Sequence, residues 1–104
     1  MKIREFSRNK EVIVIAIYRE DYADKVENFF LVIPYDGYEG LISVAESECE
    51  ITDTSLDGYR MVKNSSQSDM IVLSIVLEND LLDRMIDHDE VAMRKFHEKL
   101  STLH

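Results

Sequence analysis

The stretch Val12-Ile13-Val14-Ile15-Ala16-Ile17-Tyr18 decides the fold. It is rich in β-branched residues and is apolar at odd and even positions alike, which is typical of a strand covered on both faces or lying near the centre of a sheet. The basic residues Lys2, Arg4, Arg8 and Lys10 precede it, so a secretion signal is the alternative interpretation, although no small-residue cleavage site follows. The sequence therefore predicts a buried strand.

The next apolar segment, Val26 to Ile33, has two interpretations. Its large apolar residues have helical spacing, and Asp21 is placed to cap such a helix. However, Phe29 to Ile33 is β-prone and is closed by Pro34. We favour a strand that forms a hairpin with residues 12–18, followed by a tight turn at Asp36-Gly37.

Downstream, Leu41 to Leu56 is predicted to hold one strand. In that strand Ala45, Ser47, Cys49 and Ile51 would share one face, and Glu46, Glu48, Glu50 and Thr52 the other. Asp57-Gly58 is a hairpin signal that leads into Tyr59 to Lys63, and the polar residues from Asn64 to Asp69 predict a loop.

The C-terminal half begins with the most hydrophobic segment, Met70 to Leu77, which is predicted to be a central strand because its exposed edge would promote aggregation. Asn79 or Asp80 then caps a helix. Its apolar stripe comprises Leu82, Met85, Ile86, Ala92, Met93, Phe96, Leu100 and Leu103. Asp87 followed by Glu90 resembles a capping pattern, so the helix is expected to be broken near Asp87.

These elements together predict a single α+β domain over residues 1–104. Its sheet would be an antiparallel meander of four to five strands, with the C-terminal helix packed on one face. The helix is required physically, because strands this apolar need a cover and its stripe is the remaining large apolar surface.

Charge is concentrated in the middle of the chain. The formal net charge is -9, and residues 26–59 contain no Lys or Arg. The acids in that window are Glu27, Asp36, Glu39, Glu46, Glu48, Glu50, Asp53 and Asp57. A field of one sign steers partners of the opposite sign. A solvated strand face is the alternative, because carboxylates about 6.6 Å apart repel by only ~0.6 kcal/mol in water.

Tyrosines border the acidic block at its turns, and tyrosine is enriched at protein interfaces. The alternative is that they simply pack against the ends of hairpins. The candidate partner-binding residues are therefore Asp36, Glu39, Glu46, Glu48, Glu50, Asp53, Asp57, Tyr35, Tyr38 and Tyr59.

No catalytic, metal-binding or cofactor-binding residues are predicted. Cys49, the single cysteine, lies on the apolar side of its expected strand among acids that raise a thiol pKa. Asp87-His88-Asp89 is better explained by a helix N-terminus than by a metal site. The three glycines, Gly37, Gly40 and Gly58, form no phosphate-binding motif. The acidic balance argues against direct nucleic acid binding, and no segment is long enough to span a membrane.

The function expected from these observations is that of a small, acidic, non-enzymatic binding protein. It would mask a basic protein partner, as an inhibitor or immunity protein masks a nuclease toxin. One alternative is a homodimeric adaptor or chaperone-like domain, and another is a small carboxylate-dependent enzyme. A chain with a single cysteine allows no intrachain disulfide, which favours the cytoplasm.

Overall fold

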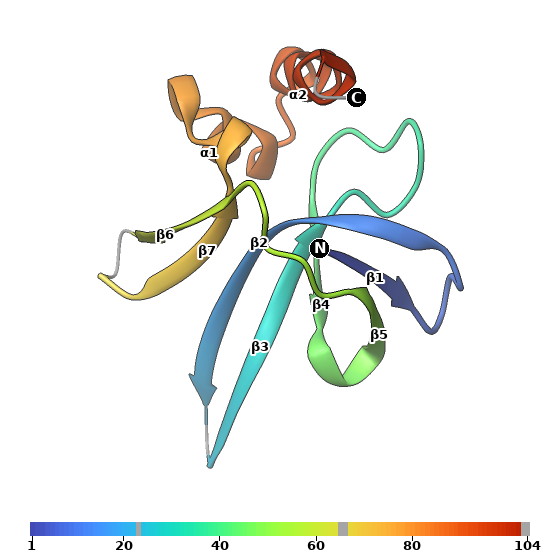
Figure 1. The fold of residues 1–104 in the computed structure, drawn as a ribbon, viewed down its shortest axis with the longest axis vertical. Coiled ribbons are helices and arrows are strands. Elements are labelled where there is room, and N and C mark those ends of the chain that lie inside the picture. Colours follow the sequence, from blue (N-terminus) through green and yellow to red (C-terminus); the bar gives the residue numbers. More distant parts are fainter. Residues whose placement is uncertain (23, 65–66, 103–104) are drawn as a thin grey trace.

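The computed structural model describes residues 1–22, 24–64 and 67–102, and Figure 1 shows its two layers. The strands are β1 (Lys2–Glu5), β2 (Glu11–Tyr22), β3 (Lys25–Val32), β4 (Ile42–Ala45), β5 (Cys49–Asp53), β6 (Tyr59–Lys63) and β7 (Asp69–Leu73). The helical elements are the 3-10 turns η1 (Glu46–Glu48), η2 (Ser74–Val76) and η3 (Glu78–Asp80), followed by α1 (Leu81–Ile86) and α2 (Glu90–Thr102). This confirms the predicted α+β class.

All strand pairs are antiparallel. Five strands follow the order β4-β3-β2-β1-β5, and β6 and β7 form a further hairpin attached to β2 through β7. The five-strand path therefore agrees with the expected size of the meander, and the β6–β7 hairpin is an addition to it. On that path β4 and β5 are the two ends, yet only η1 separates them in sequence, so the sheet curls back on itself.

The predicted strand at residues 12–18 is the centre of the fold. It forms the first part of β2, which pairs with β1, β3 and β7. Opposite β3 the register shifts between Val14 and Ala16, so Ile15 is the extra residue of a β-bulge. Val14 contacts one apolar cluster, whereas Ile15 and Ala16 both contact another. The two-sided apolar pattern in the sequence thus corresponds to two cores.

The first core lies inside the curled strands. Its buried residues are Ile3, Val14, Phe30, Val32, Val44 and Cys49. The second core lies between β2, β7 and the helices, and its buried residues are Ile15, Ala16, Leu41, Val72, Val76, Leu81, Leu82, Met85, Ala92, Met93 and Phe96. The helices therefore cover one face of the sheet, as expected.

The β2–β3 hairpin confirms the favoured interpretation of residues 26–33. The register runs from Val14 opposite Val32 to Tyr22 opposite Lys25. Tyr18 and Phe29 are directly opposite each other and their rings stack with centroids 5.4 Å apart. Strand propensity and cross-strand packing override the helical spacing here.

The single strand predicted for Leu41 to Leu56 is wrong. The chain turns through η1 between β4 and β5, because β4 pairs with β3 while β5 pairs with β1. Glu46, Glu48 and Glu50 consequently do not form a row on one strand face. The turn at Asp57-Gly58 is present, with Tyr59 N donating to Leu56 O at 3.0 Å, but it joins strands that pair elsewhere and is no hairpin.

The C-terminal half differs from the prediction at its boundaries. The strand expected for Met70 to Leu77 ends at Leu73 and is followed by η2 from Ser74, although it does lie between β2 and β6. The loop expected at residues 64–69 stops before Asp69, the first residue of β7, and its residues 65–66 lie outside the described part of the chain.

A break between α1 and α2 is confirmed near Asp87. The cap of α2 is Asp89, whose Oδ1 accepts the backbone N–H groups of Val91 at 2.9 Å and Ala92 at 3.3 Å. The prediction that Asp87 caps this helix is therefore wrong, because the capping residue lies two positions further along the chain. Of the two residues predicted to cap the helix, Asp80 is the N-cap of α1, but its side chain makes no capping hydrogen bond.

Most of the predicted apolar stripe faces the second core. Leu82, Met85, Ala92, Met93 and Phe96 are buried, and Leu100 packs against them. Ile86 is 42% exposed because it lies at the end of α1, and Leu103 lies outside the described residues.

Candidate functional site

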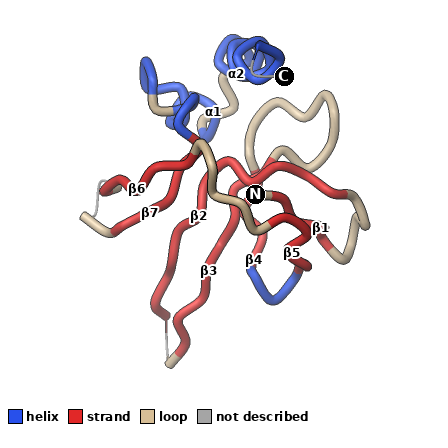
Figure 2. Tube along the Cα trace, in the orientation of Figure 1, coloured by secondary structure: helices blue, strands red, loops and turns tan. Residues whose placement is uncertain are grey.

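The sequence-predicted partner-binding residues separate into three places in the structure. Tyr35, Asp36, Tyr38 and Glu39 lie in the loop that joins β3 to β4, beside the helices (Figure 2). Asp53, Asp57 and Tyr59 lie near the N-terminal amino group of Met1, and the remaining glutamates lie on η1 and the start of β5. The acidic block is therefore continuous in sequence but not on one surface.

The β3–β4 loop is held against the helical layer by aromatic contacts. The rings of Tyr35 and Tyr38 meet edge to face with centroids 5.3 Å apart, and Tyr38 meets His88 at 5.9 Å. The Nδ1 of His88 is 2.8 Å from the carbonyl oxygen of Glu39. Asp36 Oδ2 is 4.0 Å from Lys10 Nζ. These contacts give Tyr38 a structural role.

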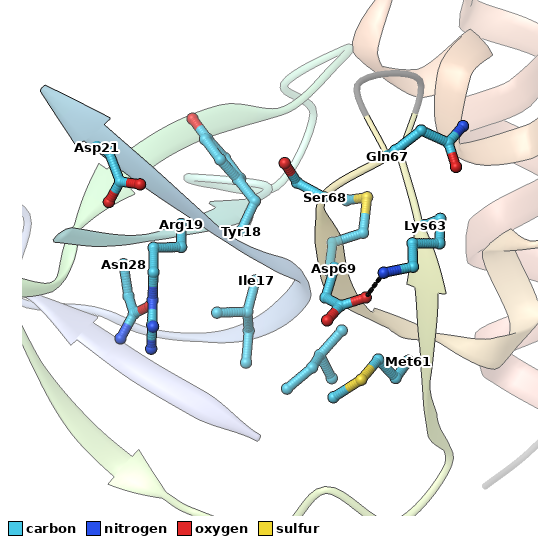
Figure 3. A pocket seen from close by; sticks show the side chains of 12 residues that line it. Ile17, Tyr18, Arg19, Asp21, Asn28, Met61, Lys63, Gln67, Ser68 and Asp69 are labelled. Carbon is cyan, nitrogen blue, oxygen red and sulfur yellow. Dashed lines mark hydrogen bonds and ion pairs between the residues drawn. The ribbon is translucent and has the colours of Figure 1, made fainter. Parts of the chain in front are cut away.

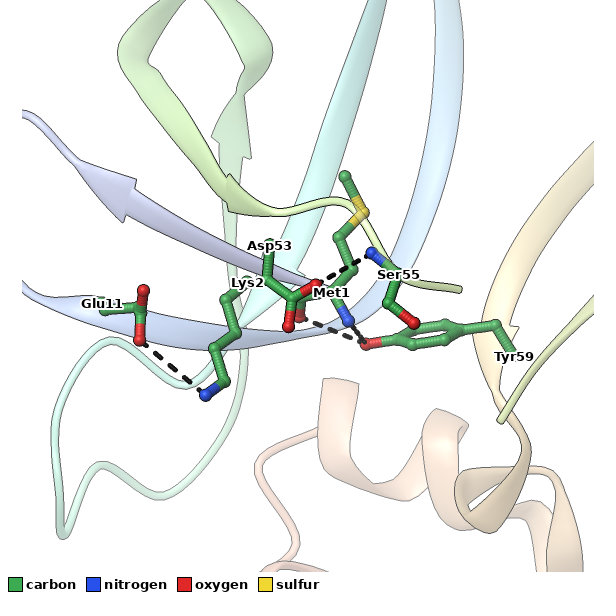
Figure 4. Close-up of polar contacts among 6 residues, drawn as sticks. All are labelled: Met1, Lys2, Glu11, Asp53, Ser55 and Tyr59. Atoms are coloured by element: carbon green, nitrogen blue, oxygen red, sulfur yellow. Dashed lines mark hydrogen bonds and ion pairs between the residues drawn. The ribbon is translucent and has the colours of Figure 1, made fainter. Parts of the chain in front are cut away.

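The second place surrounds the hydroxyl of Tyr59 (Figure 4). Tyr59 Oη donates to Val14 O at 2.6 Å and accepts from the amino nitrogen of Met1 at 3.1 Å. Burial, followed by the negative charge of Asp53, raises the pKa of Tyr59 to about 12. Asp53 itself accepts the Ser55 backbone N–H at 2.9 Å. Tyr59 thus ties β6 to β2, and its hydroxyl is already engaged.

The third place is the η1 turn. Glu46 Oε2 accepts from Asn28 Nδ2 at 3.0 Å, and Glu27 Oε1 accepts from Ser47 Oγ at 2.6 Å. Glu27 belongs to β3 and Ser47 to η1, so these hydrogen bonds fix η1 against β3. In the described part of the chain neither Glu46 nor Glu48 has an ion-pair partner, whereas Glu50 lies 3.6 Å from Arg4.

Two large apolar side chains are exposed next to η1. Phe6 is 65% exposed, and its backbone N–H donates to Glu48 O at 3.1 Å. Val26 is 61% exposed and lines a shallow hollow of about 430 Å³ together with Lys25, Glu27, Glu46 and Ser47. Exposed apolar groups rimmed by polar ones mark protein interaction sites. We call Phe6, Val26, Glu27, Glu46 and Glu48 the acidic end.

The sequence alone indicates Glu46 and Glu48 as binding residues but not the other three members of the acidic end. Glu27 belongs to the acidic block without a predicted place in a site, and no pattern marks Phe6 or Val26 as binding residues. An isolated aromatic between Glu5 and Ser7 is an available signal for Phe6, because nothing in its neighbourhood predicts a buried position. Conversely, Arg4 and Lys10 neutralise part of the block from outside the sequence window.

Cys49 lies beneath the acidic end and is buried. Burial raises the pKa of its thiol to about 11, and the negative charges of Glu46, Glu5 and Glu48 contribute in that order. A thiol with this pKa is almost fully protonated at neutral pH and is a poor nucleophile. Cys49 therefore contributes no activated nucleophile to the acidic end.

The described residues show neither a metal-binding cluster nor a membrane-spanning helix. Within them no three His, Cys, Asp or Glu side chains are grouped so as to hold a metal ion. Across 1–22, 24–64 and 67–102, neither helix combines the length and apolar character needed to cross a bilayer.

Comparison with known proteins assigns no relative to this chain. No protein-family model matches the chain, and neither a curated protein nor a solved structure matches it significantly.

Proposed function

We propose that this chain is a small non-enzymatic binding protein that masks a basic protein partner with its acidic end, as an inhibitor or immunity-type protein would mask a nuclease toxin. The observation that carries the proposal is that two exposed apolar side chains, Phe6 and Val26, each lie beside η1, the turn that carries Glu46 and Glu48. Apolar anchors supply contact area, and the carboxylates supply orientation and fast association.

The charge argument follows from the chemistry of the partner. An enzyme that binds phosphates has a positively charged cleft, so a rigid surface that presents Glu46 and Glu48, for which the described residues show no ion pair, competes with its substrate. Glu46 and Glu48 suit this role because the short η1 turn fixes their backbone and β3 supports it through Asn28. A cytoplasmic location belongs to the same proposal, since the buried Cys49 forms no disulfide within the chain.

The test begins by capturing partners from the native host at low and high salt. The captured protein is then purified, and its association rate is measured with the wild type and with E46Q/E48Q. We expect a basic partner whose enzymatic activity falls on binding, and an association rate that drops about tenfold in the variant and depends less on salt.

The matched control is D87N/E98Q, which removes the same charge from exposed positions of the helical layer. It should leave the rate nearly unchanged. An acidic partner, a partner whose activity is unaffected, or equal rates for the two variants would each overturn the proposal.

The alternative of a homodimeric adaptor is favoured by one observation. Among the described residues β6 pairs only with β7, and Met61 on β6 is 67% exposed. Light scattering separates the two proposals: a concentration-independent dimer that is lost in Met61→Lys supports the adaptor, and a monomer eliminates it.

A further inference from the structure

Strands β2 and β7 separate after only two paired positions. Ala16 lies opposite Val72 and Ile17 opposite Ile71. Beyond these pairs β2 continues to Tyr22 and pairs only with β3, while β7 runs back to Asp69 and pairs only with β6, as far as the described residues show. The β2–β3 and β6–β7 hairpins thus diverge as a V (Figure 1).

A hollow of about 520 Å³ lies on the face of this V that points away from the helices. Most of its strand residues alternate along each strand: Ile17, Arg19 and Asp21 of β2, Met61 and Lys63 of β6, and Asp69 of β7 (Figure 3), with Ile71 of β7 as a further lining residue. Two of its charged side chains form an ion pair, with Lys63 Nζ 2.8 Å from Asp69 Oδ1, and Arg19 Nε donates to the neutral amide oxygen of Asn28 at 3.3 Å.

A second hollow, of about 530 Å³, lies on the helix side of the same V. This second hollow is lined by Val62 and Met70, which alternate along their strands with residues of the first hollow, and by Leu82 and Ile86 of α1. Tyr18, Lys63 and Met70 line both hollows. The hollows therefore meet where the two strands separate, one on each face of the sheet.

We propose that the V receives an extended segment of a partner protein as an additional strand paired with β2. In an antiparallel pair every second residue turns its N–H and C=O groups away from its neighbour, so β2 beyond Ile17 presents such groups to the V. Strand addition satisfies them. The added strand would place alternate side chains into the two hollows, each of which has the size of an ordinary ligand pocket.

The lining specifies the chemistry of that segment. The helix-side hollow is mainly apolar and carries Asp80 and Asp83, neither of which has an ion-pair partner among the described residues. Side chains that enter it are apolar or basic. The opposite hollow is lined by charges of both signs, of which Lys63 and Asp69 are paired with each other, and accepts short polar side chains. The occupant is therefore an extended segment in which Val or Lys, facing the helix-side hollow, alternates with Thr, facing the opposite hollow.

This site goes beyond the proposed function, because it uses the backbone of β2 and does not involve Glu46 or Glu48. The probe is a capped peptide of about eight residues in which Val or Lys alternates with Thr. Binding is followed by amide chemical shifts and hydrogen exchange of the full-length chain. We expect alternate amides along β2, either those of Arg19 and Asp21 or that of Glu20, to change their chemical shift and to exchange about tenfold more slowly.

Three matched probes distinguish strand addition from loose contact. A peptide N-methylated at alternate backbone positions keeps its side chains but cannot pair, and should bind about tenfold more weakly. D80N/D83N should weaken binding of the Lys-containing peptide, whereas D87N/E98Q, with the same change in charge, should not. E46Q/E48Q should bind the peptide like the wild type, so this result is separable from the proposed function.

Several outcomes overturn the proposal. These are equal binding of the N-methylated peptide, shifts confined to the outer edge of β6, or no binding at about 1 mM peptide. A dimer of the free chain in sedimentation, with the slow-exchanging amides at residues 18–21, would show that a second copy fills the V and would also overturn it.

Discussion

The imidazole of His88 lies directly against Gly40, so that a Cβ on Gly40 would come within 2.2 Å of the ring Nδ1. The same Nδ1 bonds to the carbonyl of Glu39, and His88 adopts a left-handed backbone conformation with φ of 61°. The glycine therefore provides the space in which the break between α1 and α2 meets the β3–β4 loop.

Gly40→Ala is expected to destabilise the protein by about 2–3 kcal/mol, because the φ of 152° at this position strains an alanine and because the His88 ring also has to leave its position against the loop. Gly37→Ala is the control: Gly37 has φ of 90°, but a Cβ at this position would meet no atom within 4 Å, so only backbone strain of about 1 kcal/mol applies. Urea denaturation measures both. In a His88→Ala background Gly40→Ala should cost clearly less; an unchanged cost would show that the ring is not the obstacle.

Tyr59→Phe is expected to lower the free energy of unfolding by about 1–2 kcal/mol, because the carbonyl of Val14 loses its 2.6 Å donor. Thermal and urea denaturation at pH 7 measure the effect. Tyr35→Phe serves as the control, since Tyr35 is 50% exposed, and should change stability little. Equal effects of the two substitutions would contradict the anchoring role of Tyr59.

Alkaline pH should weaken the fold through Tyr59. Its pKa is raised from 10 to about 12, so the unfolded chain loses this proton more readily than the folded one. The stabilisation is fully present below pH 10 and is lost as the pH rises toward 12. The slope of unfolding free energy against pH in this window should be shallower in Tyr59→Phe. Parallel curves for variant and wild type would refute the assignment.

Cys49 should react slowly with iodoacetamide in the native state. Its thiol is buried and its pKa is raised from 9 to about 11, so both access and thiolate content are low at about pH 8. The native reaction rate should keep rising up to about pH 11, while the rate in urea should level off near the ordinary thiol pKa. Rapid native modification at neutral pH would show that the region opens.

Asp89→Ala should lower the melting temperature more than Asp87→Ala does. Asp89 receives the Arg84 Nε–H at 2.9 Å and caps α2, whereas Asp87 makes no capping bond of this kind within the described residues. The Arg84 hydrogen bond, with the backbone N–H of Ala92, lowers the pKa of Asp89. Its contribution is therefore present above the ordinary aspartate pKa and is lost as the pH falls through the lowered value. Circular dichroism melts across that acidic range would test it, and equal melting temperatures for the two variants would contradict it.

Local patterns predicted the parts of the fold that local physics determines. The strand at residues 12–18, the hairpin with residues 26–33 and the helix break near Asp87 follow from propensity, turn chemistry and periodicity. The corner at η1 was missed because Ala45 to Cys49 contains no Gly or Pro to signal it. It arises from the pairing of β4 and β5 with different strands, which is a non-local property.

The candidate site was predictable only in part for a similar reason. The acids near η1 are visible in the sequence, but the ion pairs that other members of the acidic block form, Glu50 with Arg4 and Asp36 with Lys10, depend on tertiary contacts. The V between β2 and β7 leaves no trace in composition, because it depends on where two hairpins cease to pair.

The bulge at Ile15 makes the two cores mutually dependent. One strand supplies Val14 to the interior of the curled sheet and Ile15 to the layer under the helices. Removing the helices would leave Ile15 and Ala16 exposed to water, and opening the curled sheet would withdraw the support beneath the helices. The two layers should consequently melt in a single cooperative transition, with β2 as the last segment to lose protection from hydrogen exchange.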